Sequence, residues 1–346
     1  MSVRKFFFDA GVGESRAVVT LAGRPERLII ARDGDPAVQV MGARVAARIR
    51  SVERALGLAF LDLGDGPDAV LNLAPEIGPV AEGGWIEVEI RSEARTGKGA
   101  SVRWLGPTTG PLRLLAPGPG IEARLAGLAK GAPIETGAQA RAAADQAQEE
   151  VFETVFPLRG GGSVAVEITR ALTAVDVDLG GRAGEGAKRV MRVANIAALG
   201  EAARVLRLKG LGGLVVIDLA GRGHDGSALL VAAREAFAPD NPGVSFGAIS
   251  RFGTLELTIP RRARGALDAL TGDSGTPSDR TLAMQLLRAL EREAAMDRGA
   301  RLEALASPGI AQAAQLFLAR LTQCFGDRLS LVADPTRTGF EVLRRC

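Results

Sequence analysis

From residue 163 onwards, short apolar segments of strand character alternate with longer amphipathic segments of helical character. Strands are predicted at 163–170, 172–179, 212–220, 244–250 and 254–259, and helices at 188–209 and 227–237. Each apolar strand and each apolar helix face must be buried against another layer. The alternation therefore predicts an α/β layer fold for this part of the chain.

The residues before this region have mainly strand character. Residues 3–32 hold three short apolar runs separated by Gly, Pro and charge. Five further runs between residues 38 and 105, spaced by roughly 10 residues, predict a small barrel of the OB type. Residues 106–120 contain four Gly and four Pro, which disfavour a helix or a central strand, and are predicted to be a linker.

The whole chain is predicted to have five parts. An Ala-rich helix is expected at 137–156, and a smaller α/β unit is expected after a polar, Gly-rich segment at 267–278. The predicted boundaries are 1–37 for the N-terminal strands, 38–105 for the barrel, 106–162 for a linker and helical region, 163–266 for the core, and 267–346 for a linker with the C-terminal unit.

The composition excludes several kinds of active site. The chain has one His, no Tyr and two Cys, so it cannot build a multi-His metal site, a four-Cys zinc site or a pair of catalytic His residues. The single imidazole, His224, is a weak acid/base candidate and is interpreted as an ordinary loop residue. The chemistry must then rest on carboxylates, Arg, Lys or Ser/Thr.

Features that would indicate secretion or membrane insertion are missing from the sequence. Both Cys residues lie near the C-terminal end, no apolar leader follows Met1, and no run of 18 apolar residues occurs. We therefore expect a soluble protein in the cytoplasm with no membrane partner.

Acidic residues stand at the ends of two predicted strands. Asp176 and Asp178 end one strand, and Asp218 ends another. Ligands bind outside the carboxyl ends of strands in open α/β sheets, and converging carboxylates require a counter-charge such as Mg²⁺ or Mn²⁺. An equally open alternative is that these acids cap helices or pair with nearby cations; Arg182, Arg222 and Arg251 are the candidates.

A literal G-x-G-x-x-G at 221–226 lies between a predicted strand and a predicted helix. This is the setting of a dinucleotide-binding loop. However, Asp218 would place a negative charge beside the bound phosphates, and no acid that could bind a ribose follows at the expected distance. A nucleotide-binding oxidoreductase is therefore kept only as a weak alternative.

The predicted barrel combines an aromatic residue with cations. Phe60, Lys98, Arg95 and Arg103 are candidates for binding single-stranded nucleic acid, which needs charge for its backbone and rings for its bases. The alternative for Phe60 is a place in the barrel core.

Only five of the chain's 43 cations are Lys, an excess of Arg that fits a coding bias or phosphate binding. Cations on the predicted helix at 188–209 are expected to form a solvated face.

Three segments, 155–186, 207–222 and 247–262, resemble the catalytic core of the ribonuclease E/G family. Their matching motifs are LTAVDVD, LGGLVVID and ISRFGTLE. The N-terminal strands, the barrel and the helix with EREAAM also resemble this family. The resemblance implies a fold with RNase H-like and DNase I-like parts in the large domain, an inserted S1-type barrel, and a small C-terminal α/β domain.

The resemblance also implies an activity, the cleavage of single-stranded RNA by a water-derived nucleophile that leaves a 5′-phosphate. Asp176 and Asp218 would bind Mg²⁺, with Mn²⁺ as a substitute, and act as the catalytic pair. Asp178 stands where the family usually has Asn and is a candidate third ligand. Phe60 and Lys98 match RNA-binding positions of the family's barrel, and Arg251 would contact phosphate.

The sequence departs from the family pattern at several places. The region between the barrel and residue 163 is short and lacks a clear 5′-phosphate sensor, and 270–279 has no C-x-x-C zinc link. Gly221 replaces the family's second acid after Asp218, and Asn195 is not followed by the family's Glu-Ala. We therefore expect no zinc and no zinc-linked dimer, and keep a catalytically degenerate RNA-binding homologue as the second hypothesis.

Overall fold

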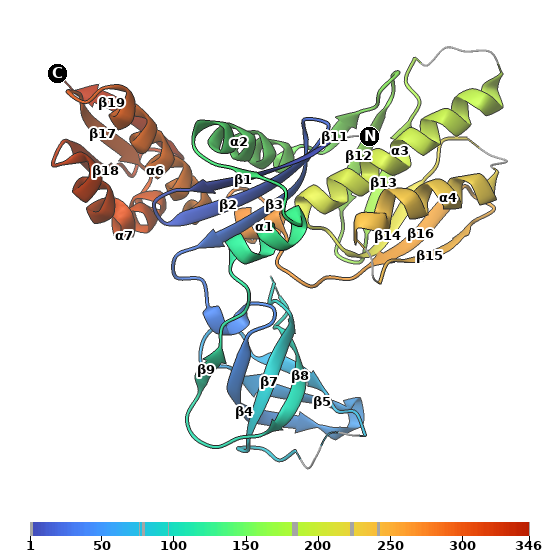
Figure 1. The fold of residues 1–346 in the computed structure, drawn as a ribbon, viewed down its shortest axis with the longest axis horizontal. Helices are drawn as coiled ribbons and strands as arrows, with labels where there is room; N and C mark the ends of the chain where they lie inside the picture. The colour runs from blue at the N-terminus through green and yellow to red at the C-terminus, as the bar shows by residue number, and fades with distance from the viewer. Residues whose placement is uncertain are drawn as a thin grey trace.

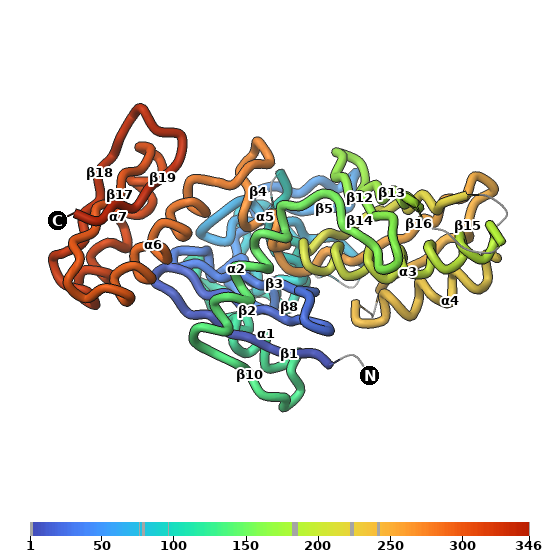
Figure 2. The backbone as a smooth tube through the Cα atoms, turned by 90° about the horizontal axis from the view of Figure 1, so that it is seen from above, coloured from blue at the N-terminus to red at the C-terminus, as the bar shows by residue number. Residues whose placement is uncertain are grey.

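The computed structural model of the chain describes residues 3–75, 77, 80–95, 97–181, 186–221, 225–240 and 243–345. These residues form four sheets with helices packed on three of them. Figure 1 shows the N-terminal sheet at the centre, the barrel below it, the large α/β layer on the right and the C-terminal unit on the left. Figure 2 shows that the α/β layer and the C-terminal unit lie at opposite ends of the molecule.

The central sheet has the order β10-β1-β2-β3. Its strands are β1 (Arg4–Ala10), β2 (Glu14–Leu21), β3 (Arg24–Arg32) and β10 (Ile134–Glu135). Helices α1 (Ile121–Ala129) and α2 (Ala138–Phe152) cover its two faces. Successive side chains of a strand point to opposite faces, so Phe6 packs with α1 whereas Phe7 packs with α2. Both faces are thereby buried.

The barrel is closed by five strands, as the sequence predicts. They are β4 (Arg44–Glu53), β5 (Leu58–Asp62), β6 (Ala69–Asn72), β7 (Trp85–Ser92) and β8 (Ser101–Pro107). Strand β4 pairs with both β5 and β7, which completes the ring. The Gly- and Pro-rich stretch adds a short edge strand, β9 (Arg113–Ala116), beside β4. Trp85 and Trp104 both lie on barrel strands.

The large layer is a six-stranded sheet of order β11-β12-β13-β14-β16-β15. Its strands are β11 (Val155–Pro157), β12 (Ser163–Ile168), β13 (Thr173–Asp178), β14 (Gly213–Asp218), β15 (Ser245–Ile249) and β16 (Thr254–Ile259). Strands β13 and β14 are parallel and the other pairs are antiparallel. Helices α3 (Ala187–Lys209) and α4 (Gly226–Phe237) pack against one face, and the alternate residues of β13 and β14 face away from them.

The C-terminal unit is a three-stranded sheet of order β18-β17-β19 with two long helices. A short helix, α5 (Ala266–Leu270), precedes it, and its elements are α6 (Asp279–Met296), β17 (Arg301–Ala306), α7 (Pro308–Phe325), β18 (Leu329–Ala333) and β19 (Phe340–Arg345). The mixed α/β class with an OB-like five-stranded barrel is confirmed. The RNase H-like and DNase I-like assignments stay predictions.

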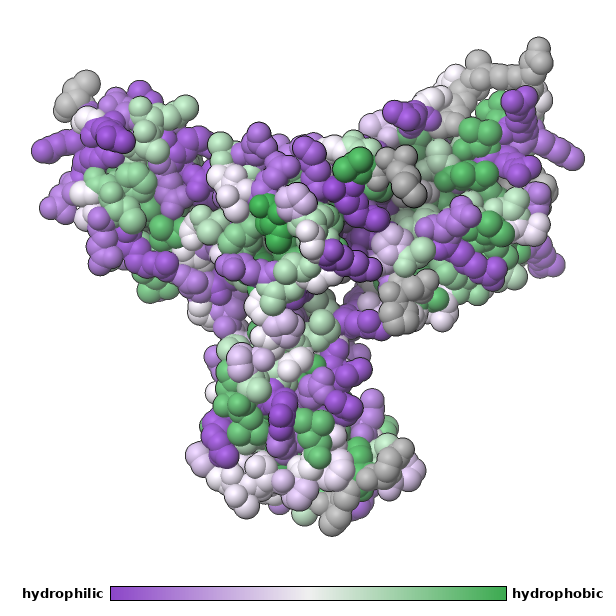
Figure 3. Space-filling view, viewed as in Figure 1, coloured by the Kyte–Doolittle hydropathy of each residue, from purple (hydrophilic) through white to green (hydrophobic). Residues whose placement is uncertain are grey.

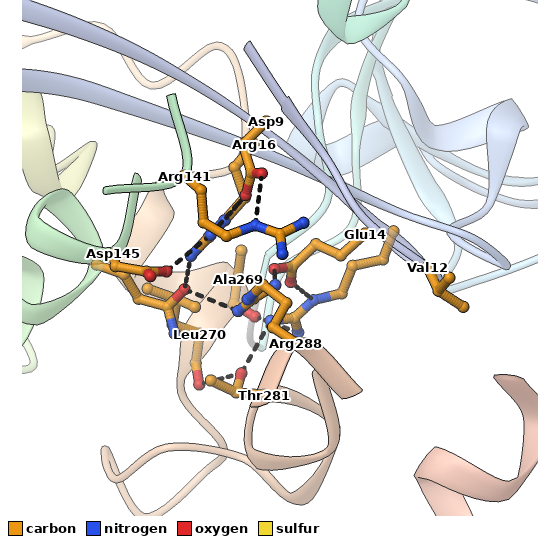
Figure 4. A network of polar contacts seen from close by, with 12 residues as sticks. Asp9, Val12, Glu14, Arg16, Arg141, Asp145, Ala269, Leu270, Thr281 and Arg288 are labelled. Atoms are coloured by element: carbon orange, nitrogen blue, oxygen red, sulfur yellow. Dashed lines mark hydrogen bonds and ion pairs between the residues drawn. The ribbon is translucent and has the colours of Figure 1, made fainter. Parts of the chain in front are cut away.

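A buried network of charges joins the C-terminal unit to the central sheet (Figure 4). Glu14 of β2 accepts hydrogen bonds from Arg32 of β3 and from Arg288 of α6, with 2.6 Å between Arg32 Nε and Glu14 Oε2. Arg16 of β2 binds Asp9 of β1, with 2.5 Å between Arg16 Nη2 and Asp9 Oδ2. Acids and cations alternate in this network, so no buried charge is left without an opposite charge beside it.

The expectation of a solvated cationic face on α3 is wrong for its second half. Arg204, Arg207 and Lys209 are all at most 8% exposed. Arg207 pairs with Glu26 of β3 at 3.0 Å and with Asp240 at 2.8 Å. This half of α3 passes beneath β3, where acids from neighbouring elements replace water around the guanidinium groups.

Candidate functional site

Asp176 and Asp218 occupy directly opposed positions on the parallel strands β13 and β14. Val175, Val177 and Ile217 of these strands point into the core against α3. Because strand side chains alternate, the two Asp side chains lie on the opposite, uncovered face, and both are exposed. The structure thus brings together the two acids that the sequence singles out.

Asp178 lies two residues further along the same face, opposite Ser163 of β12. Its Oδ1 accepts a hydrogen bond from the Gly180 backbone N–H at 3.0 Å. Among the described residues no group of three or more His, Cys, Asp or Glu side chains is gathered as a metal site. The three-carboxylate metal site therefore stays a prediction.

Among the described residues, which do not include Arg182 and Arg222, the carboxylates of Asp176 and Asp218 neither cap a helix nor pair with a cation. Within the described ranges neither one has a hydrogen bond or an ion pair. The N-cap of α3 is Gly186, and the N-cap of α4 is Asp225, whose side chain accepts the Ala228 N–H at 3.2 Å. Two adjacent oxygen donors with like charge are a fitting pair of ligands for a hard divalent cation.

Asn195 of α3 holds the chain immediately after Asp218. Its side chain donates to the Ala220 carbonyl at 3.1 Å and accepts from the Ala220 N–H at 2.9 Å. Asn195 is fully buried, so these two bonds fix the backbone two residues beyond the carboxylate. The sequence analysis named Asn195 only as part of an incomplete family motif. Its position within an apolar helix face was the signal that could have predicted this buried, hydrogen-bonding role.

Gly221, which replaces the family's second acid, has a backbone that disfavours any side chain. Its φ is +87°, and a Cβ there would lie 2.1 Å from Met191 Sδ. Only Gly adopts such a φ readily. The conformation of this loop therefore accommodates Gly at position 221 and disfavours the acid that the family has there.

A tight turn between β15 and β16 presents Arg251 and Phe252 at the same sheet edge. Gly253 accepts a hydrogen bond from the Leu219 N–H at 3.1 Å, and Thr254 is directly opposite Asp218. The Ser250 and Thr254 hydroxyls are 2.7 Å apart. The Arg251 guanidinium lies 4.6 Å from the centre of the Phe252 ring, which is 71% exposed. Phe252, beside a Gly turn, is a residue that our sequence analysis missed.

Phe60 lies on the outside of the barrel. Its neighbours Ala59 and Leu61 are fully buried in the barrel core, whereas Phe60 is half-buried and opposite Ser51 and Val70. The alternative that placed Phe60 in the core is therefore wrong, because strand alternation turns it outward. Its role in RNA binding stays a prediction.

The predicted cations of the barrel differ in their surroundings. Arg95 and Lys98 flank a turn and exchange two backbone hydrogen bonds of 2.9 Å, with Lys98 exposed. Arg103 is ion-paired with Glu89, and its hydrogen bond lowers the pKa of that carboxyl. Arg95 lines a cleft with Gly212, just before β14, whereas Asp218 is at the far end of that strand. The predicted residues thus fall into two groups. One is formed by the strand-end acids and Arg251 at one edge of the large sheet, and the other by the residues of the barrel.

Some predicted residues lie outside the described ranges. They are His224, Arg182 and Arg222, together with part of the 221–226 motif. In the described part of the chain, no helix combines the length and the apolar character needed to cross a membrane.

Known proteins resemble this region of the chain. Residues 134–262 match the Ribonuclease E/G family. The chain is 32% identical over 157 residues to Ribonuclease E of Haemophilus influenzae and 30% identical over 174 residues to Ribonuclease E of Escherichia coli K12, matches that cover 42% and 47% of it. It is 26% identical over 175 residues to Ribonuclease G of Escherichia coli K12, over 48% of this chain and 36% of that protein.

These relatives are much longer than the matched region. The matches span 17% and 16% of the length of the two ribonuclease E proteins. The matched family region contains both Asp176 and Asp218 as well as the turn with Arg251. The resemblance to the ribonuclease E/G family is thereby confirmed for residues 134–262, whereas the resemblance of the N-terminal strands, the barrel and the C-terminal helix stays a prediction.

Proposed function

Since residues 134–262 of this chain match the ribonuclease E/G family, we propose that it is a Mg²⁺-dependent endoribonuclease. It cleaves single-stranded RNA with a water-derived nucleophile, in RNA processing or decay in the cytoplasm, and leaves 5′-phosphate products. The observation that carries this proposal is the pair formed by Asp176 and Asp218 on the uncovered face of the sheet.

Asp176 and Asp218 would hold the metal ion, which supplies Lewis acidity and an activated water when bound. Asp178, two residues from Asp176, is a further candidate oxygen ligand. Asn195 fixes the chain after Asp218 and so keeps its carboxylate in register with Asp176. Each of these roles is assigned from position and donor chemistry.

The cations and rings near these acids suit the RNA chain. Arg251, at the same sheet edge, would bind a phosphate oxygen through its guanidinium. On the barrel, Phe60 offers an outward ring for a base, and Lys98 offers an exposed ammonium for the backbone. Arg103 adds positive charge, although Glu89 already neutralises part of it.

A second candidate function is RNA binding without cleavage. Gly221, whose conformation rejects the family's second acid, favours this alternative. The retained pair of strand-end acids favours cleavage, because two opposed carboxylates on an uncovered sheet face offer the oxygen ligands that a hard divalent cation takes.

The test is the cleavage of an end-labelled single-stranded RNA, in Mg²⁺ and in EDTA. We expect Asp176→Asn and Asp218→Asn to lose at least about a hundredfold in rate while RNA binding in EDTA is kept. Glu256→Gln is the matched control, because Glu256 is an exposed acid on the next strand, β16, opposite Val216.

The outcome decides between the two functions. Cleavage lost in EDTA and in both Asp variants, with Glu256→Gln active, supports the nuclease. A wild type that binds RNA but never cleaves it supports the degenerate homologue, and cleavage that persists in EDTA contradicts the proposed metal dependence.

A further inference from the structure

A cleft of about 510 Å³ lies where the barrel meets the large α/β layer. It is lined by Arg95 from the β7–β8 turn, by Lys209 and Gly212 between α3 and β14, and by Arg261 and Arg264 after β16. Figure 3 shows hydrophilic residues gathered at this neck, on the side of the barrel that faces the α/β layer. The cleft thus has four cations in its lining, together with the three acids Glu93, Asp268 and Asp273, and it lies between two units of the molecule.

Two of the four cations in the cleft already have partners. Lys209 donates to the carbonyl of Val151 at 2.8 Å and to that of Glu153 at 2.5 Å. Arg264 pairs with Asp268, with 3.3 Å between Nε and Oδ2. Neither cation is therefore available to bind a ligand without breaking a contact.

Arg95 and Arg261 differ from Lys209 and Arg264 in having no ion pair. In the described ranges no carboxylate oxygen lies within 4 Å of either guanidinium. Burial and the charge of Arg95 both lower the pKa of Arg261, so the two like charges are close enough to repel each other. The charge of Asp268 raises the pKa of Arg261, but this effect is smaller than the two that lower it. Asp268 is also ion-paired with Arg264. Convergent cations of this kind form a site for an anion.

The Arg261 side chain is held in place by the backbone beneath it. A Cβ built on Gly213 would lie 3.0 to 3.2 Å from its Nη2, Nε and Cζ atoms, and one on Gly212 would lie 2.8 Å from its Cγ. Gly212 and Gly213 therefore leave the space in which this guanidinium rests. A fixed guanidinium loses less entropy when it binds a phosphate.

We propose that Arg95 and Arg261 together bind one phosphate of the RNA backbone, and that this contact joins the barrel to the catalytic sheet. The inference rests on the proposed function, because RNA supplies the anion. Gly213 begins β14 and Asp218 ends it, so the bound phosphate is about 17 Å from the carboxylate pair along the strand. The site therefore engages the RNA a few nucleotides away from the bond that is cut.

The test measures the binding of a fluorescein-labelled oligoribonucleotide in EDTA, where binding is separated from cleavage. We expect Arg95→Ala and Arg261→Ala each to weaken binding about tenfold and to reduce the slope of log K against log salt by about 0.7 to 1. The double variant should bind no more than about twofold more weakly than either single one, since both residues hold the same phosphate. Arg298→Ala, which removes an exposed Arg of the C-terminal unit, is the control.

A second measurement locates the phosphate. Oligoribonucleotides that carry one uncharged methylphosphonate at successive positions should show one position where the loss of charge weakens wild-type binding. That effect should vanish in Arg261→Ala, and the position should lie a constant few nucleotides from the cleavage site.

The results separate this site from the proposed function. Unchanged affinity and salt slope in both single variants, or an equal loss in Arg298→Ala, would overturn the site while leaving the nuclease intact. A wild type that binds no RNA would overturn the nuclease and this site with it.

Discussion

Individual polar side chains inside this protein act by fixing backbone segments. Asn195 holds Ala220 next to the carboxylate of Asp218, and Lys209 ties the end of α3 to the end of α2 through the carbonyls of Val151 and Glu153. Each is buried, so the loss of its bonds leaves unpaired groups that cost about 1–3 kcal/mol. Their substitution should therefore be measurable in both stability and activity.

We expect Asn195→Ala to lower the cleavage rate by about tenfold or more and to raise the Mg²⁺ concentration that gives half of the maximal rate. A purely structural role would lower the melting temperature without changing that Mg²⁺ concentration. The control is Asn72→Ala at the exposed end of β6. An unchanged Mg²⁺ requirement in Asn195→Ala would contradict the positioning role.

Lys209 gives the protein a distinct dependence of stability on pH. Burial lowers its pKa from 10.5 to about 8, against the opposing attraction of Glu153 and Glu150. Between these two values the unfolded chain binds a proton that the folded chain lacks, so the free energy of unfolding rises with pH, by at most about 1.4 kcal/mol per unit. With no Tyr and only five Lys, few other groups titrate there.

The prediction is checked by urea unfolding at several pH values from 7.5 to about 10.5. Wild type should gain stability across this window, and Lys209→Met should show a flatter profile. Lys188→Met, at the exposed start of α3, is the matched control and should follow the wild type.

Among the elements, the turn between β15 and β16 is the one whose exposed side chains have the clearest consequence for binding. The Phe252 ring is free on one side and carries the Arg251 guanidinium near the other, on a turn fixed by Ser250 and Thr254. Stacking of one base on such a ring is worth about 1–3 kcal/mol.

We expect Phe252→Ala to weaken RNA binding by about tenfold with no loss of thermal stability, and Phe252→Trp to retain it. Leu56→Ala is the control, because Leu56 is 70% exposed on the barrel and offers no aromatic face. Equal affinities of Phe252→Ala and wild type would rule out a stacking role for this ring.

The pattern of apolar residues predicted most of the long elements, because periodic burial determines them. The helix predicted at 188–209 is α3, and the five barrel strands coincide with the predicted runs, except that β8 extends to Pro107, beyond the predicted end of the barrel at residue 105. The helix α1 and the strands β9 and β19 were not predicted, since they are short and depend on contacts with distant segments. Phe252 and Asn195 were missed for the same reason, because their surroundings consist of residues that are distant in the sequence and become neighbours only in the folded protein.

The register of Asp176 against Asp218 also could not be read from the sequence. Strand ends with acids suggested convergence, but only the parallel pairing of β13 with β14 makes the two residues direct neighbours. Similarly, the expectation of a solvated α3 failed because the cations Arg204 and Arg207 have acidic partners from β3, α2 and the end of α4.

At the scale of the whole molecule, buried ion pairs connect units of the fold that are far apart in the sequence. Glu14 is 3% exposed and lies between Arg32 and Arg288, so it couples the central sheet to the C-terminal unit. Burial raises its pKa, but the charges of Arg288 and Arg32 outweigh burial and lower it overall. Arg residues thus have a structural use in this protein as the partners of buried acids.

We expect Glu14→Gln to lower the free energy of unfolding by about 3–5 kcal/mol, because two buried guanidinium groups lose their partner. As the pH falls below about 4.5, the usual pKa of Glu, the unfolded wild type takes up a proton before the folded protein does, and stability declines. Chemical unfolding from pH 7 to pH 3 would show this decline in wild type and a smaller one in Glu14→Gln. Glu303→Gln is the control, because Glu303 of β17 is only partly buried and its partner, Arg345, is exposed.

Trp85 and Trp104 are the only Trp residues of the chain, both belong to the barrel, and the chain has no Tyr. The intrinsic fluorescence of the protein beyond the Phe range therefore comes from one unit alone. Trp85 also lies 5.9 Å from the Arg48 guanidinium, so its emission responds to charge at the barrel surface. An unlabelled sample consequently carries its own optical reporter: we expect RNA binding at the barrel to change the Trp emission, and cleavage at the sheet of Asp176 and Asp218 to leave it unchanged.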